Sequence, residues 1–297
     1  MKFSKPPKTF EEQMDLLENR GMIINDRAAA SHHLAHLNYY RLTAYWRSFQ
    51  EDTVTHRFKQ GTLFDEAINL YMFDKKLRLL LLNAIERIEI SARTQWAYHF
   101  AHEHGSHAYL NKDFSSNKDT FKRDMEKLKD EFGRSEEVFI LHYKNTYNSP
   151  SMPPIWAICE IMSLGLLSRF YSNLNSKEVR KAIANTYNLN QTIMKSLLRH
   201  LAYVRNLCAY HSRIWNRKFG ITMKVPRSIP SELNHNFNTT EERKLYNTLV
   251  LLVYMMNIIN PSNKWKKRLL HLIDEHHIDT VFMGFPVHYM ELSIWKS

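Results

Sequence analysis

The stretch FDEAINLYMFDKKLRLLLLNAIERIEISARTQWAYHFAHEH, residues 64–104, decides the fold class. Apolar residues recur in it every three or four positions, from Leu70 and Phe73 to Ile88 and Ala92, and no proline or glycine interrupts the pattern. This spacing is typical of one face of an α-helix and differs from the strict alternation of a half-buried strand. The stretch therefore predicts one long helix, or two in close series, in an all-α protein.

Helical spacing continues on both sides of this stretch. Thr9 and Glu12 have the spacing of a capping box ahead of a short helix, and Gly21 is placed to end that helix. Residues 218–236 hold one glycine and two prolines and are expected to lack firm structure, and the last twenty residues are expected to form a short strand or coil. Further helices are predicted at residues 118–131, 136–147, 155–174, 188–211, 239–259 and 263–277.

Glycine is scarce in this chain. Seven glycines occur in 297 residues, whereas average usage would give roughly twenty. They occur singly, so no glycine-rich loop is present to bind a nucleotide phosphate through backbone amides, and Walker-type ATPases and dinucleotide-binding enzymes are not expected. Because no internal repeat, low-complexity tract or strong linker divides the chain, we expect a single all-α domain over residues 1–297.

Charge points to a polyanionic partner. The 41 basic and 30 acidic residues give a net charge of +11, which favours nucleic acid over an anionic membrane surface. The longest apolar run, LVLLVYMMNII from Leu249, is about half of the ~20 residues that a membrane span needs, and it fits a buried helix. Two cysteines are too few for a disulfide framework. We therefore expect a cytoplasmic protein with no membrane partner.

A second stretch, RNLCAYHSRIWNR at residues 205–217, carries the candidate chemistry. Cleavage of RNA without a metal needs a group that transfers protons, which suits histidine, and a group that neutralises charge on the phosphate, which suits arginine. On an ideal helix Arg205 and His211 lie about 120° apart, so they meet at one phosphate only if the helix ends or bends between them. Two copies facing each other across a dimer axis would also bring these groups into a shared cleft.

The same residues also have a purely structural interpretation. His211 would continue the apolar stripe that runs from Ile193 to Cys208 and would be a hydrogen-bonded core histidine. Asn206 and Tyr210 share a helix face and could contact the same RNA, or Tyr210 could simply cover the cleft.

Two acidic residues and an arginine of the long helix form a related candidate. Glu86, Glu89 and Arg93 lie within two turns and could form an intrahelical ion-pair ladder. Either carboxylate could instead pair with Arg205 or orient it from a second helix. Both interpretations stay open at the level of sequence.

Four blocks of the sequence occur in a fixed order. They are NYYRLTAYWRSF (38–49), LYMFDKKLRLLLLNAIERIEISART (70–94), PPIWAICEIMSLGLLSRFYSNL (153–174) and RNLCAYHSRIWNR (205–217). In this order they resemble the bacterial abortive-infection proteins of the AbiD/AbiF type. That family is similar to the HEPN superfamily, helical domains whose active members are metal-independent ribonucleases with an Arg-x(4–6)-His motif. The resemblance implies phage defence by RNA damage and growth arrest.

The resemblance also implies an architecture and a set of partners. It implies a HEPN-type helical bundle, with a core at about residues 62–217 on which helices at 8–50 and 238–278 pack. RNA is the implied substrate, a regulatory small RNA a further partner, and a homodimer the implied assembly. No cofactor is implied.

For the site, the resemblance implies Arg205, Asn206 and His211 as catalytic residues, supported by Tyr210 and by the acidic and basic residues of the long helix. The family pattern carries two consecutive histidines where this chain has Tyr210 and His211. Two alternatives to a nuclease therefore stay open. One is a catalytically silent RNA-binding module or a toxin held by a structured small RNA, and the other is a toxin controlled by nucleotide transfer onto Tyr210.

Basic residues outside the motif are candidates for RNA binding. The aromatic and basic mixture at residues 38–49 suits stacking and phosphate contact, and a lysine cluster follows at 264–268. Histidine-rich segments at 31–36 and 99–107 lack HExxH spacing and paired cysteines, so no metal site is expected. The predicted RNA-binding residues are Arg41, Arg47, Arg213, Arg217, Lys264, Lys266, Lys267 and Arg268.

Overall fold

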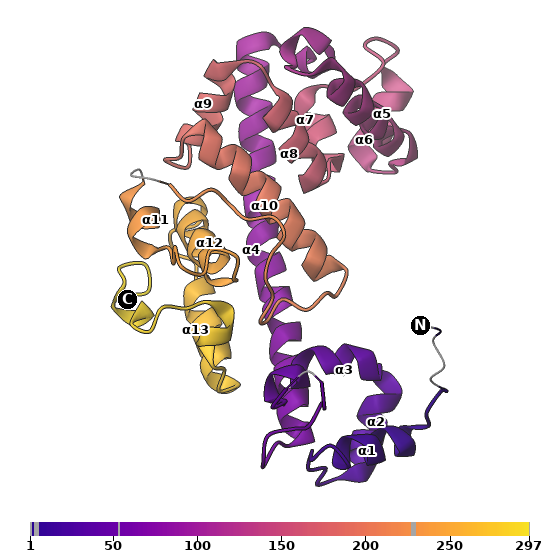
Figure 1. Cartoon of the computed structure of the whole chain (residues 1–297). Coiled ribbons are helices and arrows are strands. Elements are labelled where there is room, and N and C mark those ends of the chain that lie inside the picture. Colours follow the sequence, from indigo (N-terminus) through magenta and orange to yellow (C-terminus); the bar gives the residue numbers. More distant parts are fainter. Residues whose placement is uncertain (1, 3–5, 53, 227–229, 297) are drawn as a thin grey trace. The chain divides into compact units, whose positions relative to one another are not determined.

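The computed structural model describes residues 2, 6–52, 54–226 and 230–296. These residues form thirteen α-helices and several 3₁₀ turns, and apart from isolated bridges they form no β-structure (Figure 1). The all-α prediction is confirmed. None of the described helices is both long and apolar enough to span a membrane.

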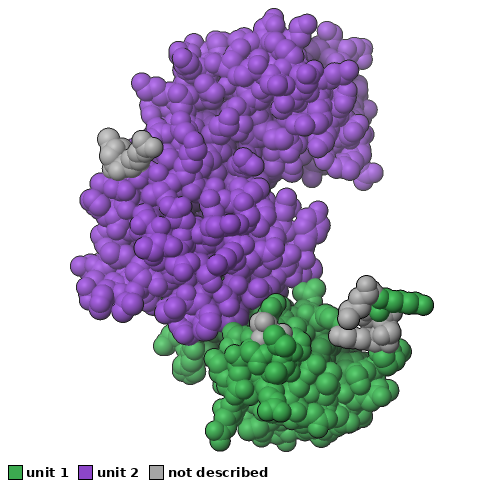
Figure 2. All heavy atoms as spheres, viewed as in Figure 1, with its two compact units in different colours: residues 1–77, 270–278 green, residues 78–269, 279–297 purple. Residues whose placement is uncertain are grey.

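The chain divides into two compact units (Figure 2). Unit 1 comprises residues 1–77 and 270–278, and unit 2 comprises residues 78–269 and 279–297. The boundaries fall inside α4 (Phe64–His104) and α13 (Trp265–Glu275). The single domain over residues 1–297 and its core at about 62–217 stay predictions.

The periodic stretch at residues 64–104 is one uninterrupted helix. α4 contains 41 residues, as its apolar periodicity predicted. The residues of its apolar stripe are buried, among them Phe73, Leu81, Ile88 and Ala92. The helix ends before Gly105, whose φ of +93° is easily adopted only by glycine.

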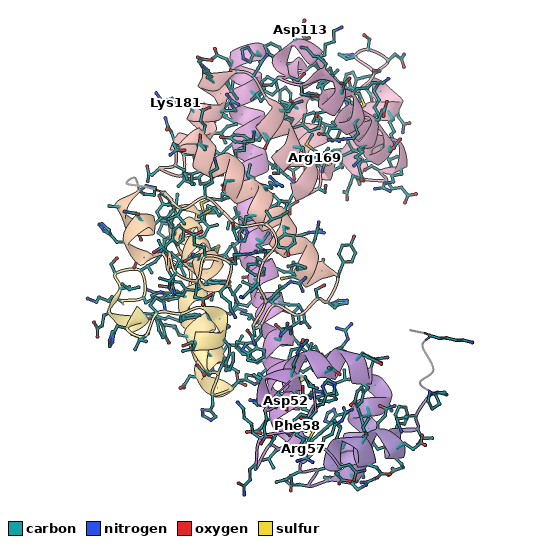
Figure 3. All side chains as sticks on the ribbon, viewed as in Figure 1. Asp52, Arg57, Phe58, Asp113, Arg169 and Lys181 are labelled. Atoms are coloured by element: carbon teal, nitrogen blue, oxygen red, sulfur yellow. The ribbon has the colours of Figure 1, made fainter. Side chains whose placement is uncertain are left out.

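Unit 1 contains α1 (Phe10–Glu18), α2 (Arg27–His36) and α3 (Tyr39–Trp46). The predicted capping box is present, because the Glu12 amide donates to the Thr9 hydroxyl at 3.2 Å and the Thr9 amide donates to the Glu12 carboxylate at 2.7 Å. A turn after α3 carries Asp52, Arg57 and Phe58 (Figure 3). The buried Phe58 fixes this turn against α1, because its amide donates to the Arg20 carbonyl at 2.8 Å.

Unit 2 is built around α10 (Gln191–Ala209), which packs on α8 and α9. In α10, the stripe of Ile193, Leu197, Leu201, Val204 and Cys208 is buried, as predicted. The remaining helices of this unit are α5 (Lys118–Arg134), α6 (Val138–Thr146), α7 (Ile155–Ile158), α8 (Leu164–Asn173), α9 (Lys177–Asn185), α11 (Ser231–Asn236) and α12 (Tyr246–Ile259).

Charged and apolar contacts stabilise unit 2. Arg169 on α8 donates to the buried Asp124 of α5 at 2.8 Å, and its side chain is seen in Figure 3. α12 contains the whole apolar run from Leu249 and is buried along most of its length, so the interpretation of that run as a buried helix is confirmed.

Several predicted elements differ from the structure. The helix predicted at 155–174 is broken, because Ser163 adopts an extended conformation and its hydroxyl caps α8 by accepting from the Leu166 amide at 3.2 Å. α9 was not predicted, and α11 lies in the segment 218–236 that was expected to lack structure, of which residues 227–229 are outside the described range. The last twenty residues were expected to form a short strand or coil; the described ones form 3₁₀ turns at Thr280–Met283 and Tyr289–Glu291, and no strand is present in them.

Candidate functional site

The end of α10 positions the candidate histidine. The Ser212 amide donates to the Leu207 carbonyl at 2.9 Å, and the His211 amide donates to the Cys208 carbonyl at 3.1 Å. These two bonds form a Schellman motif, in which the residue after the C-cap takes a left-handed conformation. His211 occupies that position with φ of +56°, and its side chain is exposed. The helix therefore ends between Arg205 and His211, and the interpretation of His211 as a core histidine is wrong.

Another histidine of α10 has that core role. His200 is 3% exposed. Its Nδ1 lies 2.8 Å from the Ile221 carbonyl and donates to it, and its Nε2 accepts from the Thr248 hydroxyl at 2.8 Å. Burial lowers the pKa of His200 to about 4, so this ring is neutral in the folded protein near pH 7.

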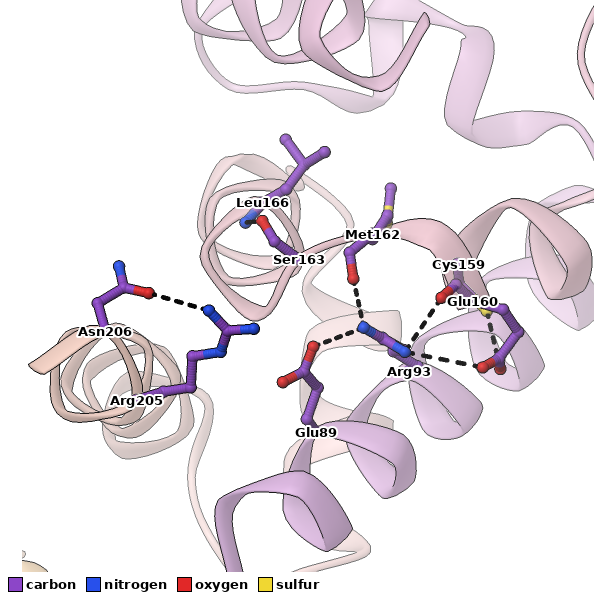
Figure 4. Close-up of polar contacts among 9 residues, drawn as sticks. All are labelled: Glu89, Arg93, Cys159, Glu160, Met162, Ser163, Leu166, Arg205 and Asn206. Atoms are coloured by element: carbon purple, nitrogen blue, oxygen red, sulfur yellow. Dashed lines mark hydrogen bonds and ion pairs between the residues drawn. The ribbon is translucent and has the colours of Figure 1, made fainter. Parts of the chain in front are cut away.

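Arg205 lies at an open pocket of about 380 Å³ between α10 and α4. The pocket is also lined by Glu86 and Glu89, which sequence reasoning had singled out. Arg205 extends towards Glu89 in Figure 4, but within the described part of the chain it forms no ion pair. Its Nη1 donates a long hydrogen bond of 3.5 Å to the Oδ1 of Asn206, which is exposed beside it.

Glu89 already has a different partner. Arg93 Nη2 donates to Glu89 Oε1 at 2.5 Å, and both side chains are largely buried. Burial raises the pKa of Glu89 above its ordinary value, while Arg93 and Arg205 favour the charged form. Arg93 also donates to the carbonyls of Glu160, at 3.1 Å, and Met162, so it joins α4 to the turn before α8 (Figure 4).

The predicted ion-pair ladder of α4 is thus present only in part. Glu89 and Arg93 form the i, i+4 pair, whereas Glu86 is exposed and makes no ion pair with any described residue. Three further residues line the pocket and were not predicted from the sequence: Leu79, Leu82 and Asn83. Asn83, Leu82 and Leu79 lie three, four and seven residues before Glu86, which places them on the same helix face, and that spacing was the available signal.

A family model described as Abi-like protein matches residues 32–216. The chain belongs to the Abi-like protein family. The expected abortive-infection family is thereby confirmed, whereas the AbiD/AbiF type and the HEPN superfamily stay proposals. Searches of curated proteins and of solved structures found no match to this Abi-like chain.

The match contains the whole Arg205 pocket and the turn at His211. Tyr210, at the C-cap between them, is 78% exposed. Of the predicted RNA-binding residues, Arg41 and Arg47 are exposed on and after α3, and Arg213 is half-buried beyond the turn. The remaining predicted RNA-binding residues, from Arg217 onward, lie outside the match.

The lysine cluster of α13 is not uniform. Lys264, Lys267 and Arg268 are exposed. Lys266 is half-buried, and its Nζ donates to the carbonyls of Ile294 at 3.2 Å and Lys296 at 2.5 Å. Lys266 therefore contributes to the packing of the C-terminal segment.

Arg217 also has a local partner, because its Nη1 donates to the Arg213 carbonyl at 3.2 Å.

Among the residues described, no three histidine, cysteine or acidic side chains are grouped to hold a metal ion.

Proposed function

We propose that this Abi-like protein is a metal-independent endoribonuclease of the HEPN type that acts in phage defence by cleaving RNA and arresting growth. Arg205 would bind the scissile phosphate, His211 would act as general acid or base, and Asn206 would orient the substrate. Glu86, Glu89 and Arg93 would position Arg205 from α4, and Tyr210 would line the cleft.

The observation that carries this proposal is the conformation of His211. A left-handed residue other than glycine costs roughly 1–2 kcal/mol, and such strain is concentrated at functional sites. A glycine at this position would end α10 without that cost. A histidine here instead presents an exposed imidazole on a turn that two backbone hydrogen bonds fix.

The surroundings of Arg205 support the same proposal. An arginine that only stabilised the fold would be expected to pair with the nearest carboxylate, but the Glu89 carboxylate is already hydrogen-bonded to Arg93. Arg205 remains exposed at an open pocket, and its planar guanidinium can donate two hydrogen bonds to a phosphate. The nearby carboxylates would hold the guanidinium in place before RNA binds.

The proposed assembly is a homodimer, in which each protomer contributes Arg205 and His211 to a shared cleft. Light scattering at micromolar concentration should then give twice the mass of one chain. A fully active monomer would remove the dimer from the proposal and leave the individual roles of the two residues to be tested separately.

A second candidate function is a catalytically silent protein that binds RNA. It is favoured by Tyr210, because the resembling family carries a histidine at this position and Tyr210 projects an exposed ring instead. Tyr210→His should raise RNA cleavage if the tyrosine has weakened the site. Cleavage that is absent from both forms, with RNA binding retained, would favour the silent protein.

Expression in bacteria tests the proposed function. Wild-type protein should arrest growth, and Arg205→Ala should relieve the arrest while the helical circular dichroism is unchanged. Arg199→Ala is the matched control, because Arg199 is exposed on the same helix and does not line the Arg205 pocket. Arrest that persists in folded, abundant Arg205→Ala would contradict the proposal.

A further inference from the structure

Unit 1 has a pocket of its own, of about 560 Å³. Residues from α1, α3, the turn after α3 and the segment before α1 line it, among them Gln13, Arg20, Tyr39, Tyr40 and Trp46. A volume of this size lies within the ~300–1,000 Å³ of pockets for small ligands. The pocket lies entirely within unit 1, whereas the residues that line the Arg205 pocket belong to unit 2.

Aromatic rings form one side of this pocket. Trp46 is 1% exposed, and its ring packs edge-on against Tyr39 with 5.1 Å between centroids. Tyr40 is 74% exposed, whereas the preceding Tyr39 is half-buried. An exposed tyrosine beside a fixed aromatic pair offers a face on which a planar ring can stack.

The charged side chains of the pocket indicate the charge of the ligand. Arg20 is half-buried, and among the described residues its side chain has a neutral partner, the Tyr39 hydroxyl, to which Nη1 donates at 3.4 Å. Arg20 forms no ion pair with a described carboxylate, and no described Asp or Glu lines the pocket, whereas Lys8 does. A half-buried cation in a pocket without acidic groups favours an anionic ligand.

Gln13 indicates a second property of the ligand, which is a hydrogen-bond donor. Its Nε2 donates to the Lys8 carbonyl at 3.0 Å, but its Oε1 is buried and has no hydrogen-bond partner within the described part of the chain. A buried acceptor without a partner costs free energy unless a ligand donates to it. An acyl chain has no N–H group to donate, whereas the edges of nucleobases do.

We propose that this pocket binds a single ribonucleotide. The base stacks on Tyr40 and donates an N–H to Gln13 Oε1, and the phosphate binds Arg20 and Lys8. The nucleotide is either free in solution or part of a single-stranded RNA, since both present the same base and phosphate. This site is separate from the proposed cleavage site and does not depend on cleavage.

Equilibrium binding tests the proposal. The probes are the four ribonucleoside 5′-monophosphates, the matching nucleosides and a 5′-phosphorylated trinucleotide. Arg20→Gln should weaken binding of the best monophosphate about 10- to 150-fold, the range for a lost hydrogen bond to a charged group, and should leave nucleoside binding unchanged. Tyr40→Ala should weaken monophosphate and nucleoside alike, by about 5- to 150-fold. Tighter binding of the trinucleotide assigns the site to an RNA strand, and tighter binding of the monophosphate assigns it to a free nucleotide.

Two further variants serve as controls for the binding measurements. Arg57→Gln removes the same charge from an exposed residue of unit 1 that does not line the pocket, and it should bind like the wild type. Arg205→Gln reports on the other pocket, because a monophosphate bound there would lose its phosphate contact in this variant and not in Arg20→Gln. No binding of any probe by the wild type, or binding that Arg205→Gln abolishes and Arg20→Gln spares, would overturn the proposal, and neither result would decide whether the protein cleaves RNA.

Discussion

Arg93 donates a hydrogen bond of 2.5 Å to Glu89, four residues earlier on α4, and so binds the carboxylate that faces Arg205. The same guanidinium donates to two carbonyls of the turn before α8. Glu89 is therefore fixed by a partner other than Arg205. Arg205 therefore lies near the Glu89 carboxylate without forming an ion pair with it. Its guanidinium remains available for the proposed contact with a phosphate.

Replacement of Arg93 should destabilise unit 2. Arg93→Met leaves Glu89 and two carbonyls without their donor, so we expect the free energy of unfolding to fall by about 2–4 kcal/mol. Urea denaturation measures this change. Glu89→Gln retains a side chain of the same shape and should cost less. Equal losses for the two variants would show that the carbonyl contacts of Arg93 contribute little.

Substitutions of His211 should change thermal stability and RNA cleavage independently of each other. His211→Gly removes the cost of the left-handed conformation, so thermal stability should equal or exceed that of the wild type, by up to ~1 kcal/mol, while RNA cleavage is lost. His211→Asn also tolerates the conformation and should behave similarly, whereas His211→Val should be less stable. Full cleavage by folded His211→Gly would exclude the imidazole from the reaction.

The buried His200 predicts a specific pH dependence. Its pKa is lowered to about 4 in the folded protein, whereas an unfolded histidine titrates near ~6.5. Between these values the unfolded chain binds the additional proton, so the contribution is fully present above about pH 6.5 and is lost as the pH falls towards about 4, by about 3 kcal/mol in all.

Unfolding at pH 7 and pH 4.5 measures this contribution. The loss between the two pH values should be smaller in His200→Gln than in the wild type. His235→Gln, at an exposed histidine of α11, should lose as much as the wild type. An identical loss in the wild type and His200→Gln would contradict the assignment.

Three exposed basic residues at the start of α13 predict a salt-dependent contact with RNA, Lys267 and Arg268 on the helix and Lys264 immediately before it. If Lys264, Lys267 and Arg268 each contact a phosphate, their joint replacement by glutamine should reduce the slope of log affinity against log salt by about 0.7 per contact on single-stranded RNA. Lys266 is left unchanged, because it binds backbone carbonyls. Replacement of the exposed Lys122, Lys127 and Lys129 of α5 is the control for net charge. Equal slopes in both triple variants would remove α13 from the RNA-binding surface.

Periodicity predicted the long elements of this fold because burial of one helix face follows directly from apolar spacing. α4 and the stripe of α10 are the clearest cases. The break between α7 and α8 depends on a single capping hydroxyl at Ser163, which an apolar pattern does not reveal. α11 is six residues long, too short for periodicity to mark it. α9 has nine residues, and its buried Val179 and Ile183 have helical spacing, so the signal for this helix was present and was missed.

The sequence predicted which residues form the candidate site but not how these residues are arranged. The motif at 205–217 identified Arg205 and His211, yet no glycine marks the end of α10, so the left-handed turn at His211 could not be expected. Whether Glu89 pairs with Arg93 or with Arg205 depends on how α4 meets the turn before α8. Those segments are about seventy residues apart in the sequence, so local spacing cannot decide between the two pairs.

Cleavage of RNA by purified protein in the presence of a chelator is the sharpest test of the proposed ribonuclease activity. We expect products with 2′,3′-cyclic phosphate ends, no cleavage at a 2′-deoxy position, and a rate that falls about 10²–10³-fold in Arg205→Gln, the range for a lost transition-state donor. Arg199→Gln should cleave at the wild-type rate. Cleavage that needs an added divalent metal, or that proceeds unchanged in Arg205→Gln, would show that the protein is not a metal-independent ribonuclease with Arg205 in its site.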